Sequence, residues 1–178
     1  MSAGTTPEPV RGLDNVIALS SAVCRLSATD GRLAYRGYDV RELGERSSAE
    51  ETAYLLIAGD LPTAPELRRF AGEIRDRQKL SPACLRALKA VPQGADAMSA
   101  LRAVLAVAAM EHVVATPPAH EDALAQGLRL LGLTPTVVAA SHRLRLGQKP
   151  VLPRKSLSYA ANLLAMVTGT PPGPESAR

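Results

Sequence analysis

The sequence contains very few aromatic residues, which limits the kind of core it can form. Only 3% of its 178 residues are aromatic, with no tryptophan and a single phenylalanine, Phe70. A core must therefore be built from Leu, Val, Ala and Met. The hydrophobic share of 46% is enough for a globular fold, and the 21% of charged residues includes both signs, which argues against wholesale disorder. A chain of this length predicts one domain.

Residues for redox or metal chemistry are also scarce. Cys24 and Cys84 lie far apart in no paired motif, which is typical of packing residues in a reduced, cytoplasmic protein. His120-Glu121 opens like a zinc-binding helix, but Leu124 stands where the second histidine is needed. Neither a glycine-rich phosphate loop nor a serine-nucleophile elbow is present. We therefore predict no metal, no cofactor and no catalytic residue, and the roles of three histidines stay open: His112, His120 and His142.

Charge and hydropathy argue against nucleic-acid and membrane partners. The net charge of +4 comes from scattered basic residues with almost no aromatics between them, unlike nucleic-acid-binding surfaces. The run His142-Arg143-Leu144-Arg145 with Lys149 could contact an anion, but a solvated helix end explains it better. The apolar stretch at residues 101–110 is too short to span a bilayer, and residues 1–10 lack a signal-peptide pattern. We predict a cytoplasmic protein.

The pattern along the chain predicts an all-α fold with a short N-terminal β-hairpin. Residues 22–26 and 33–35 flank Thr29-Asp30-Gly31, a hairpin turn signal. Capping signals at Asp39, Ser48, Thr63 and Ser81 predict helix starts, and Gly59 and Gly169 predict helix ends. The predicted helices cover residues 39–43, 53–58, 64–74, 82–90, 98–110, 121–131, 135–146 and 157–168.

Two of these helices are candidates for an interface with another chain. Residues 98–110 are apolar on nearly every side, and a helix of that kind must be buried in a core or at an interface. The helix predicted at residues 135–146 has a similar apolar face. We expect both to pack against another chain; the alternative is that they pack on each other and on residues 157–166 within a monomer. The interface candidates are Met98, Leu101, Leu105, Val137, Val138 and Leu144.

Several segments, in order, resemble the N-terminal part of the citrate synthase family. The string Asp30-Gly31-Arg32-Leu33-Ala34-Tyr35-Arg36-Gly37-Tyr38-Asp39-Val40 is similar to its D-G-x-L-x-Y-R-G-Y-D-I signature. Met98-Ser99-Ala100-Leu101 resembles an H-P-M-x-x-L helix start, with Asp96-Ala97 replacing the His-Pro. Other similar segments are Gly12-Leu13-Asp14-Asn15-Val16, the A-Y-L-L-x-x-G-x-L-P block at 53–62, the L-x-P-T-I-V-A-A block at 133–143, and the S-Y-A-x-N block at 158–169.

The signature string is interpreted as structural. Gly31 supplies turn geometry, and Arg36, flanked by apolar residues, is expected to hydrogen-bond to backbone or to a carboxylate. The signature residues are Asp30, Gly31, Tyr35, Arg36, Gly37 and Tyr38, and the core candidates in these blocks are Tyr35, Tyr38, Leu55 and Leu56.

The resemblance implies enolate chemistry in which an acyl-CoA, usually acetyl-CoA, condenses with oxaloacetate. In the family an aspartate removes a proton, histidines polarise carbonyls and arginines hold carboxylates. In the family those groups lie downstream, starting with an H-A-D-H-G-like segment shortly after a helix that would begin here at Pro174. No residue of this chain matches them, so none is assigned as catalytic or substrate-binding.

Three hypotheses for the function follow. The chain is one subunit of a split citrate or 2-methylcitrate synthase, a non-catalytic binding or regulatory relative, or an inactive truncated fragment. The first implies a homo-oligomer or a hetero-oligomer with a C-terminal half, with acyl-CoA and oxaloacetate bound only in the assembly. The expected organisation is a flexible N-terminus at 1–11, a helical domain at 12–170 and the start of a further helix at 171–178.

Overall fold

The computed structural model describes residues 20–27, 29–112 and 118–173. This part of the chain is mainly helical with a small antiparallel sheet at its N-terminal end, which confirms the predicted fold class. The predicted flexible N-terminus, the Gly12-Leu13-Asp14-Asn15-Val16 block and the helix start at Pro174 lie outside the described residues. The elements are β1 Cys24–Ser27, β2 Arg32–Tyr35, β3 Tyr38–Asp39, α1 Val40–Arg46, α2 Ala49–Ala58, α3 Ala64–Asp76, α4 Pro82–Ala90, α5 Ala97–Met110, α6 His120–Arg145 and α7 Tyr159–Thr168.

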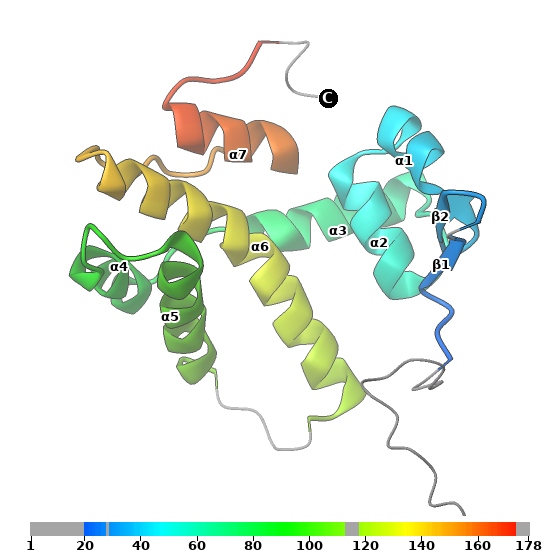
Figure 1. The fold of residues 1–178 in the computed structure, drawn as a ribbon, viewed down its shortest axis with the longest axis horizontal. Helices are drawn as coiled ribbons and strands as arrows, with labels where there is room; N and C mark the ends of the chain where they lie inside the picture. The colour runs from blue at the N-terminus through cyan, green and yellow to red at the C-terminus, as the bar shows by residue number, and fades with distance from the viewer. Residues whose placement is uncertain (1–19, 28, 113–117, 174–178) are drawn as a thin grey trace, which may run out of the picture.

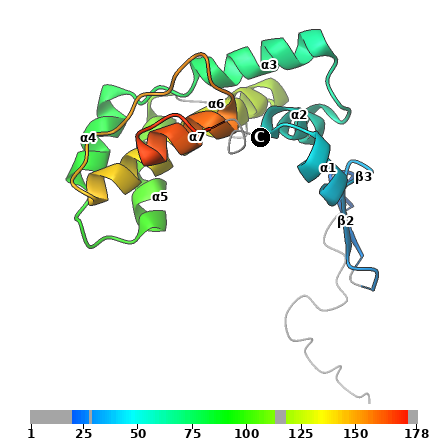
Figure 2. The ribbon, with the colours of Figure 1, turned by 90° about the horizontal axis from the view of Figure 1, so that it is seen from above.

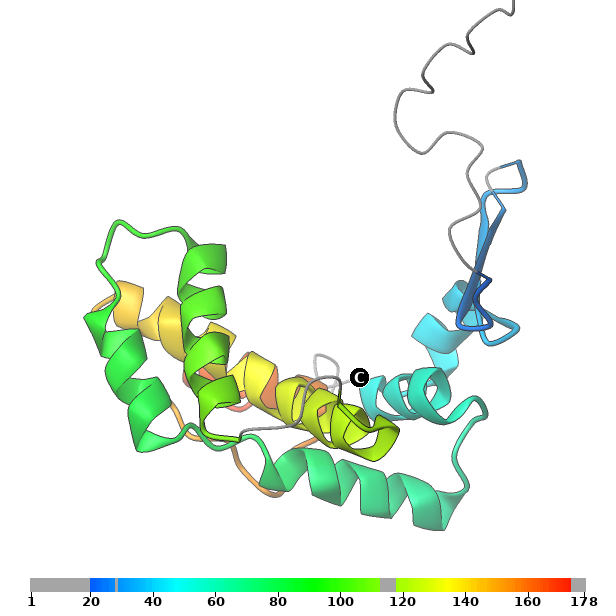
Figure 3. The ribbon, with the colours of Figure 1, turned by 90° about the horizontal axis from the view of Figure 1, so that it is seen from below.

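Helix α6 runs through the middle of the molecule and organises the other helices (Figure 1). Helices α3, α4, α5 and α7 all contact it, and α2 contacts α3 and α7. The sheet and α1 project from one end of the helical array, while α4 and α5 form the other end (Figures 2 and 3). The main apolar cluster lies where α4, α5 and α6 meet, and its buried members are Cys84, Leu88, Val104, Ala108, Leu133, Val137 and Ala140.

The N-terminal sheet contains one strand more than predicted. Strands β1 and β2 pair in the expected hairpin, with Cys24 opposite Tyr35 and Ser27 opposite Arg32. A second hairpin follows, in which Tyr35 pairs with Tyr38 across the two-residue turn Arg36-Gly37. Both turn residues have positive φ, 49° and 95°, as a type I′ turn requires.

Two predictions for this sheet are wrong because little of it is covered by other elements. The side chain of Tyr38, a predicted core residue, is 38% exposed. Cys24, expected to be a packing residue, is also exposed, whereas Cys84 is buried as predicted. Of the other core candidates, Leu55 is buried, and Tyr35 and Leu56 are half-buried.

Local capping interactions fix most helix starts. Ser48 and Glu51 form the predicted capping box at α2, and Gly59, with φ of 102°, ends that helix. Helix α5 begins after Asp96, whose carboxylate accepts hydrogen bonds from the Met98 and Ser99 amides at 2.9 and 3.0 Å. Hydrogen bonds from the Ser99 side chain and from these amides lower the pKa of Asp96. The residue that replaces the family's histidine is therefore a helix cap.

The helices predicted at 121–131 and 135–146 are one continuous helix, α6, with Pro135 inside it. Proline has no amide hydrogen, so the Leu131 carbonyl loses its usual donor four residues later. The Tyr159 hydroxyl of α7 donates to that carbonyl at 2.8 Å, and the Thr134 hydroxyl donates to the Leu130 carbonyl at 2.6 Å. The helix continues past the proline because a side chain from another helix replaces the missing donor.

A close crossing of α3 and α6 depends on Gly132. A Cβ atom added at Gly132 would lie 2.7 Å from the Ile74 carbonyl oxygen and 2.8 Å from the Arg77 Cβ. Glycine is therefore needed for this approach. In the described part, α6 is also the one helix long and apolar enough to cross a membrane, yet all its buried residues lie from Gly132 to Ala140 against neighbouring helices. It is a core helix.

Candidate functional site

The signature residues make structural contacts around the sheet. Asp30 accepts a hydrogen bond from the Ser27 hydroxyl at 2.8 Å at the hairpin tip, where Gly31 has φ of 60°. The Arg36 guanidinium donates to the Leu56 carbonyl at 3.0 Å, as expected for a hydrogen bond to backbone. This places a cation near the C-terminal end of α2, where the helix dipole favours it. The string thus ties the sheet to α2.

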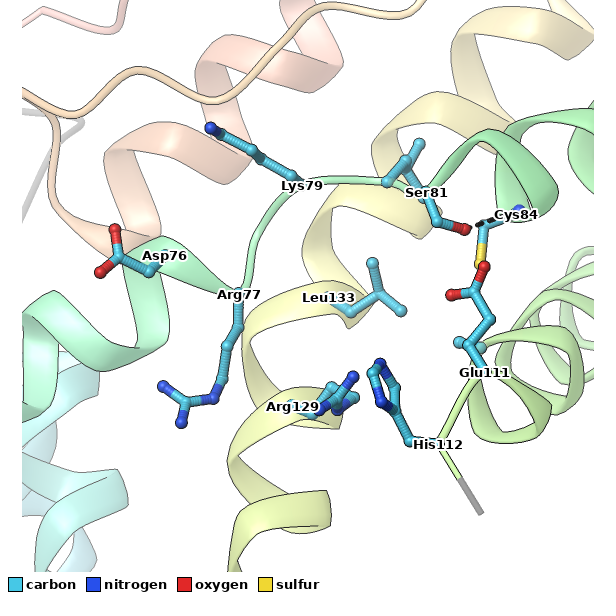
Figure 4. A pocket seen from close by; sticks show the side chains of 11 residues that line it. Asp76, Arg77, Lys79, Ser81, Cys84, Glu111, His112, Arg129 and Leu133 are labelled. Carbon is cyan, nitrogen blue, oxygen red and sulfur yellow. Dashed lines mark hydrogen bonds between the residues drawn. The ribbon is translucent and has the colours of Figure 1, made fainter.

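A polar pocket of about 300 Å³ opens where α3, α4, α5 and α6 converge (Figure 4). Cys84, Ala108 and Leu133 are its buried apolar lining. Around the opening, Glu111 and His112 come from the end of α5 and Arg129 comes from α6 (Figure 4). The remaining lining residues are Asp76, Arg77, Lys79, Leu80 and Ser81.

The polar side chains of this pocket differ in whether they already have hydrogen-bond partners. Arg77 is already engaged, because its Nη1 donates to the Glu73 carbonyl at 2.7 Å and lies 3.8 Å from the Glu73 carboxylate. The Nε of Arg129 is buried and has no hydrogen-bond partner within the described residues. The Cys84 thiol faces the Val104 carbonyl at 3.9 Å. Among the described lining residues, no nucleophile is hydrogen-bonded to a base.

The histidines and the basic run near the end of α6 do not form a common site. His112, His120 and His142 are all exposed, and the described residues contain no group of three potential metal ligands. The interpretation of the basic run as a solvated helix end is wrong for Arg143. Its Nε donates to the Lys149 carbonyl at 2.7 Å and its Nη1 to the Val167 carbonyl at 3.4 Å. Arg143 therefore holds the end of α6 against the following loop and α7.

Sequence reasoning missed a set of buried polar contacts around α7. The Glu50 carboxylate of α2 accepts a hydrogen bond from the Tyr159 amide at 2.8 Å. Burial, together with the negative charge of Glu50, raises the pKa of the Tyr159 hydroxyl. Asn162 is buried, and its side-chain amide bonds to both the amide and the carbonyl of Arg154 at 2.8 Å. In the sequence, only the Ser-Tyr-Ala-x-Asn block marked Tyr159 and Asn162, and it did not indicate which residues they contact.

The structure divides the six interface candidates into three groups. Val137 is 0% exposed and belongs to the core of this chain, so it has no surface to offer a partner. Leu101, Leu105 and Leu144 are partly buried against that same core. Met98 and Val138 are 61% and 42% exposed. Packing within one chain thus accounts for much of the apolar character of α5 and α6.

Comparisons with known proteins place the chain in a family. The sequence profile described as "Citrate synthase, C-terminal domain" matches residues 12–178. The chain is 37% identical over 167 residues to a citrate synthase of Synechocystis, covering 94% of this chain and 42% of that protein. It is 32% identical over 169 residues to a 2-methylcitrate synthase of Mycobacterium tuberculosis, covering 93% and 42% respectively. The chain belongs to the citrate synthase family.

The solved structures agree with this assignment. The crystal structure of citrate synthase from Thermotoga maritima superposes with a TM-score of 0.81 at 33% identity, covering 91% of this chain and 42% of that one. The citrate synthase of Pyrobaculum aerophilum gives the same TM-score, 0.81, at 28% identity, covering 98% and 47%. The chain therefore spans less than half the length of the relatives it matches.

Proposed function

We propose that this chain supplies a helical framework to a citrate or 2-methylcitrate synthase. The assembled enzyme would condense acetyl-CoA or propionyl-CoA with oxaloacetate in the cytoplasm. The proposal rests on the superposition of 91% of this chain on the Thermotoga enzyme at 33% identity. Because that match covers 42% of the enzyme, we place the catalytic groups in the remainder of the fold, the part that this chain does not match.

The described residues support a framework role. Their polar contacts join elements to one another: Arg36 bonds to α2, Glu50 to α7 and Tyr159 to α6. Each of these contacts joins a side chain to the backbone of another element. Carbon–carbon bond formation through an enolate needs a base and electrostatic stabilisation of the developing oxyanion. We therefore expect the chain alone to release no CoA above background from acetyl-CoA and oxaloacetate.

The proposed remainder of the fold is expected to pack on the exposed apolar residues of α5 and α6. Met98 and Val138 are the exposed members of the candidate set, and large exposed apolar side chains often mark contact surfaces when they gather. A second polypeptide carrying the remainder would make a hetero-oligomer, and two complete assemblies would make a homo-oligomer.

The test is reconstitution. The purified chain is mixed with a polypeptide comprising the part of the Synechocystis citrate synthase that this chain does not match, and CoA release is measured with acetyl-CoA and with propionyl-CoA. The positive control replaces this chain with the matching segment of the Synechocystis enzyme. We expect complex formation in sedimentation and activity that neither component shows alone.

Two variants show whether the complex uses the predicted surface. Val138→Glu should weaken association, whereas Leu26→Glu, on the exposed strand β1, should not. A folded monomer that ignores the added polypeptide, while the Synechocystis segment binds it, would contradict the proposal. That result would leave a non-catalytic relative or an inactive fragment.

A further inference from the structure

A second cavity, which shares only Leu80 with the polar pocket, lies between α4, the C-terminal half of α6 and the segment that follows α6. Its volume is about 550 Å³, within the range of small-molecule binding sites. Most of its lining is apolar, and the apolar residues are Leu80, Leu85, Leu144, Pro150, Val151 and Leu152.

The charged residues of this cavity are all of one sign. Lys89 of α4 and Lys149 of the segment after α6 line it, and no Asp or Glu does. Neither lysine forms an ion pair within the described residues. The polar pocket described above differs in this respect, because it contains acidic as well as basic side chains. An apolar cavity with only ammonium groups favours an anionic ligand with an apolar body.

We propose that this cavity binds a medium-chain aliphatic monocarboxylate. The alkyl chain lies on the leucine and valine side chains, and the carboxylate is held by Lys89 and Lys149. Two features of the cavity carry the proposal: its apolar lining and its uncompensated positive charge. It does not depend on the proposed framework function.

The test measures binding of decanoate, below its micellar concentration, to the full chain by titration calorimetry. We expect saturable binding at one site per chain. Decanol and decylamine share the alkyl chain but lack the carboxylate, and should bind about tenfold more weakly or worse, because a charge-assisted hydrogen bond is lost. Equal affinity for decanol would overturn the proposal, since it would show only nonspecific apolar association.

Variants locate the site. The double variant Lys89→Ala with Lys149→Ala should lower decanoate affinity about tenfold, whereas Lys79→Ala with Lys155→Ala, at exposed lysines outside this cavity, should not. Leu152→Ser, at a largely exposed position, should weaken binding without unfolding the chain. No saturable binding, or equal effects of the two lysine pairs, would refute the assignment.

Discussion

The hydroxyl of Tyr159 is predicted to be worth a measurable part of the stability of the fold. Tyr159→Phe removes the donor to the Leu131 carbonyl, and Pro135 cannot provide another. A carbonyl left without a partner in a partly buried site costs about 1–3 kcal/mol. The free energy of unfolding of a domain is about 5–15 kcal/mol, so the loss should be clear in urea unfolding followed by circular dichroism.

A double-mutant cycle tests the cause of that loss. Pro135→Ala restores an amide at position 135, which can donate to the Leu131 carbonyl as in an ordinary helix. In this background Tyr159→Phe should cost about 1 kcal/mol less than in the wild type, whatever the packing effect of Pro135→Ala itself. Tyr38→Phe, at an exposed tyrosine, is the control and should change stability by less than about 0.5 kcal/mol. If Tyr159→Phe costs the same in both backgrounds, the hydroxyl does not substitute for the missing amide.

Three further predictions concern backbone geometry and capping. Gly132→Ala should lower stability by about 1–3 kcal/mol, whereas Gly127→Ala, in the same helix with open space around it, should raise it by about 0.5–1 kcal/mol in thermal melts. Gly31→Val should cost about 1–3 kcal/mol because φ is +60°, and an unchanged melting temperature would contradict the turn assignment. The lowered pKa of Asp96 means that its capping contribution is present above its ordinary pKa of 3.8 and is lost as pH falls through the lowered value. Asp96→Asn should therefore make the free energy of unfolding less dependent on pH in the acid range. An unchanged pH dependence would argue against the cap.

The parts of the fold that sequence could predict are those controlled by neighbouring residues. The capping box at Ser48 and the stop at Gly59 are local interactions, so a short string located both, although the helix was predicted from Ala53 and α2 begins at Ala49. Strand β3 was missed because it has only two residues and its turn places Arg36 at positive φ, where a non-glycine residue is uncommon.

Long-range contacts were beyond sequence reasoning. The rule that proline ends a helix gave two helices where α6 is one, because the compensating Tyr159 lies 28 residues beyond Leu131. The bond between Glu50 and the Tyr159 amide joins residues 109 positions apart. The resemblance marked Tyr159 and Pro135 as parts of two separate blocks, and only the structure shows that one compensates for the other.

The position of Pro135 divides α6 into two halves with different support. No residue from His120 to Leu131 is buried, whereas seven of the following residues up to Ala140 are. The first half is thus an arm that stays helical chiefly by extending an anchored segment, and the proline removes one backbone bond close to the junction. The Tyr159 hydroxyl compensates for the missing backbone bond by donating to the Leu131 carbonyl. Order in the arm, and in the Arg129 side of the polar pocket, is therefore coupled to the docking of α7, although α7 does not line that pocket.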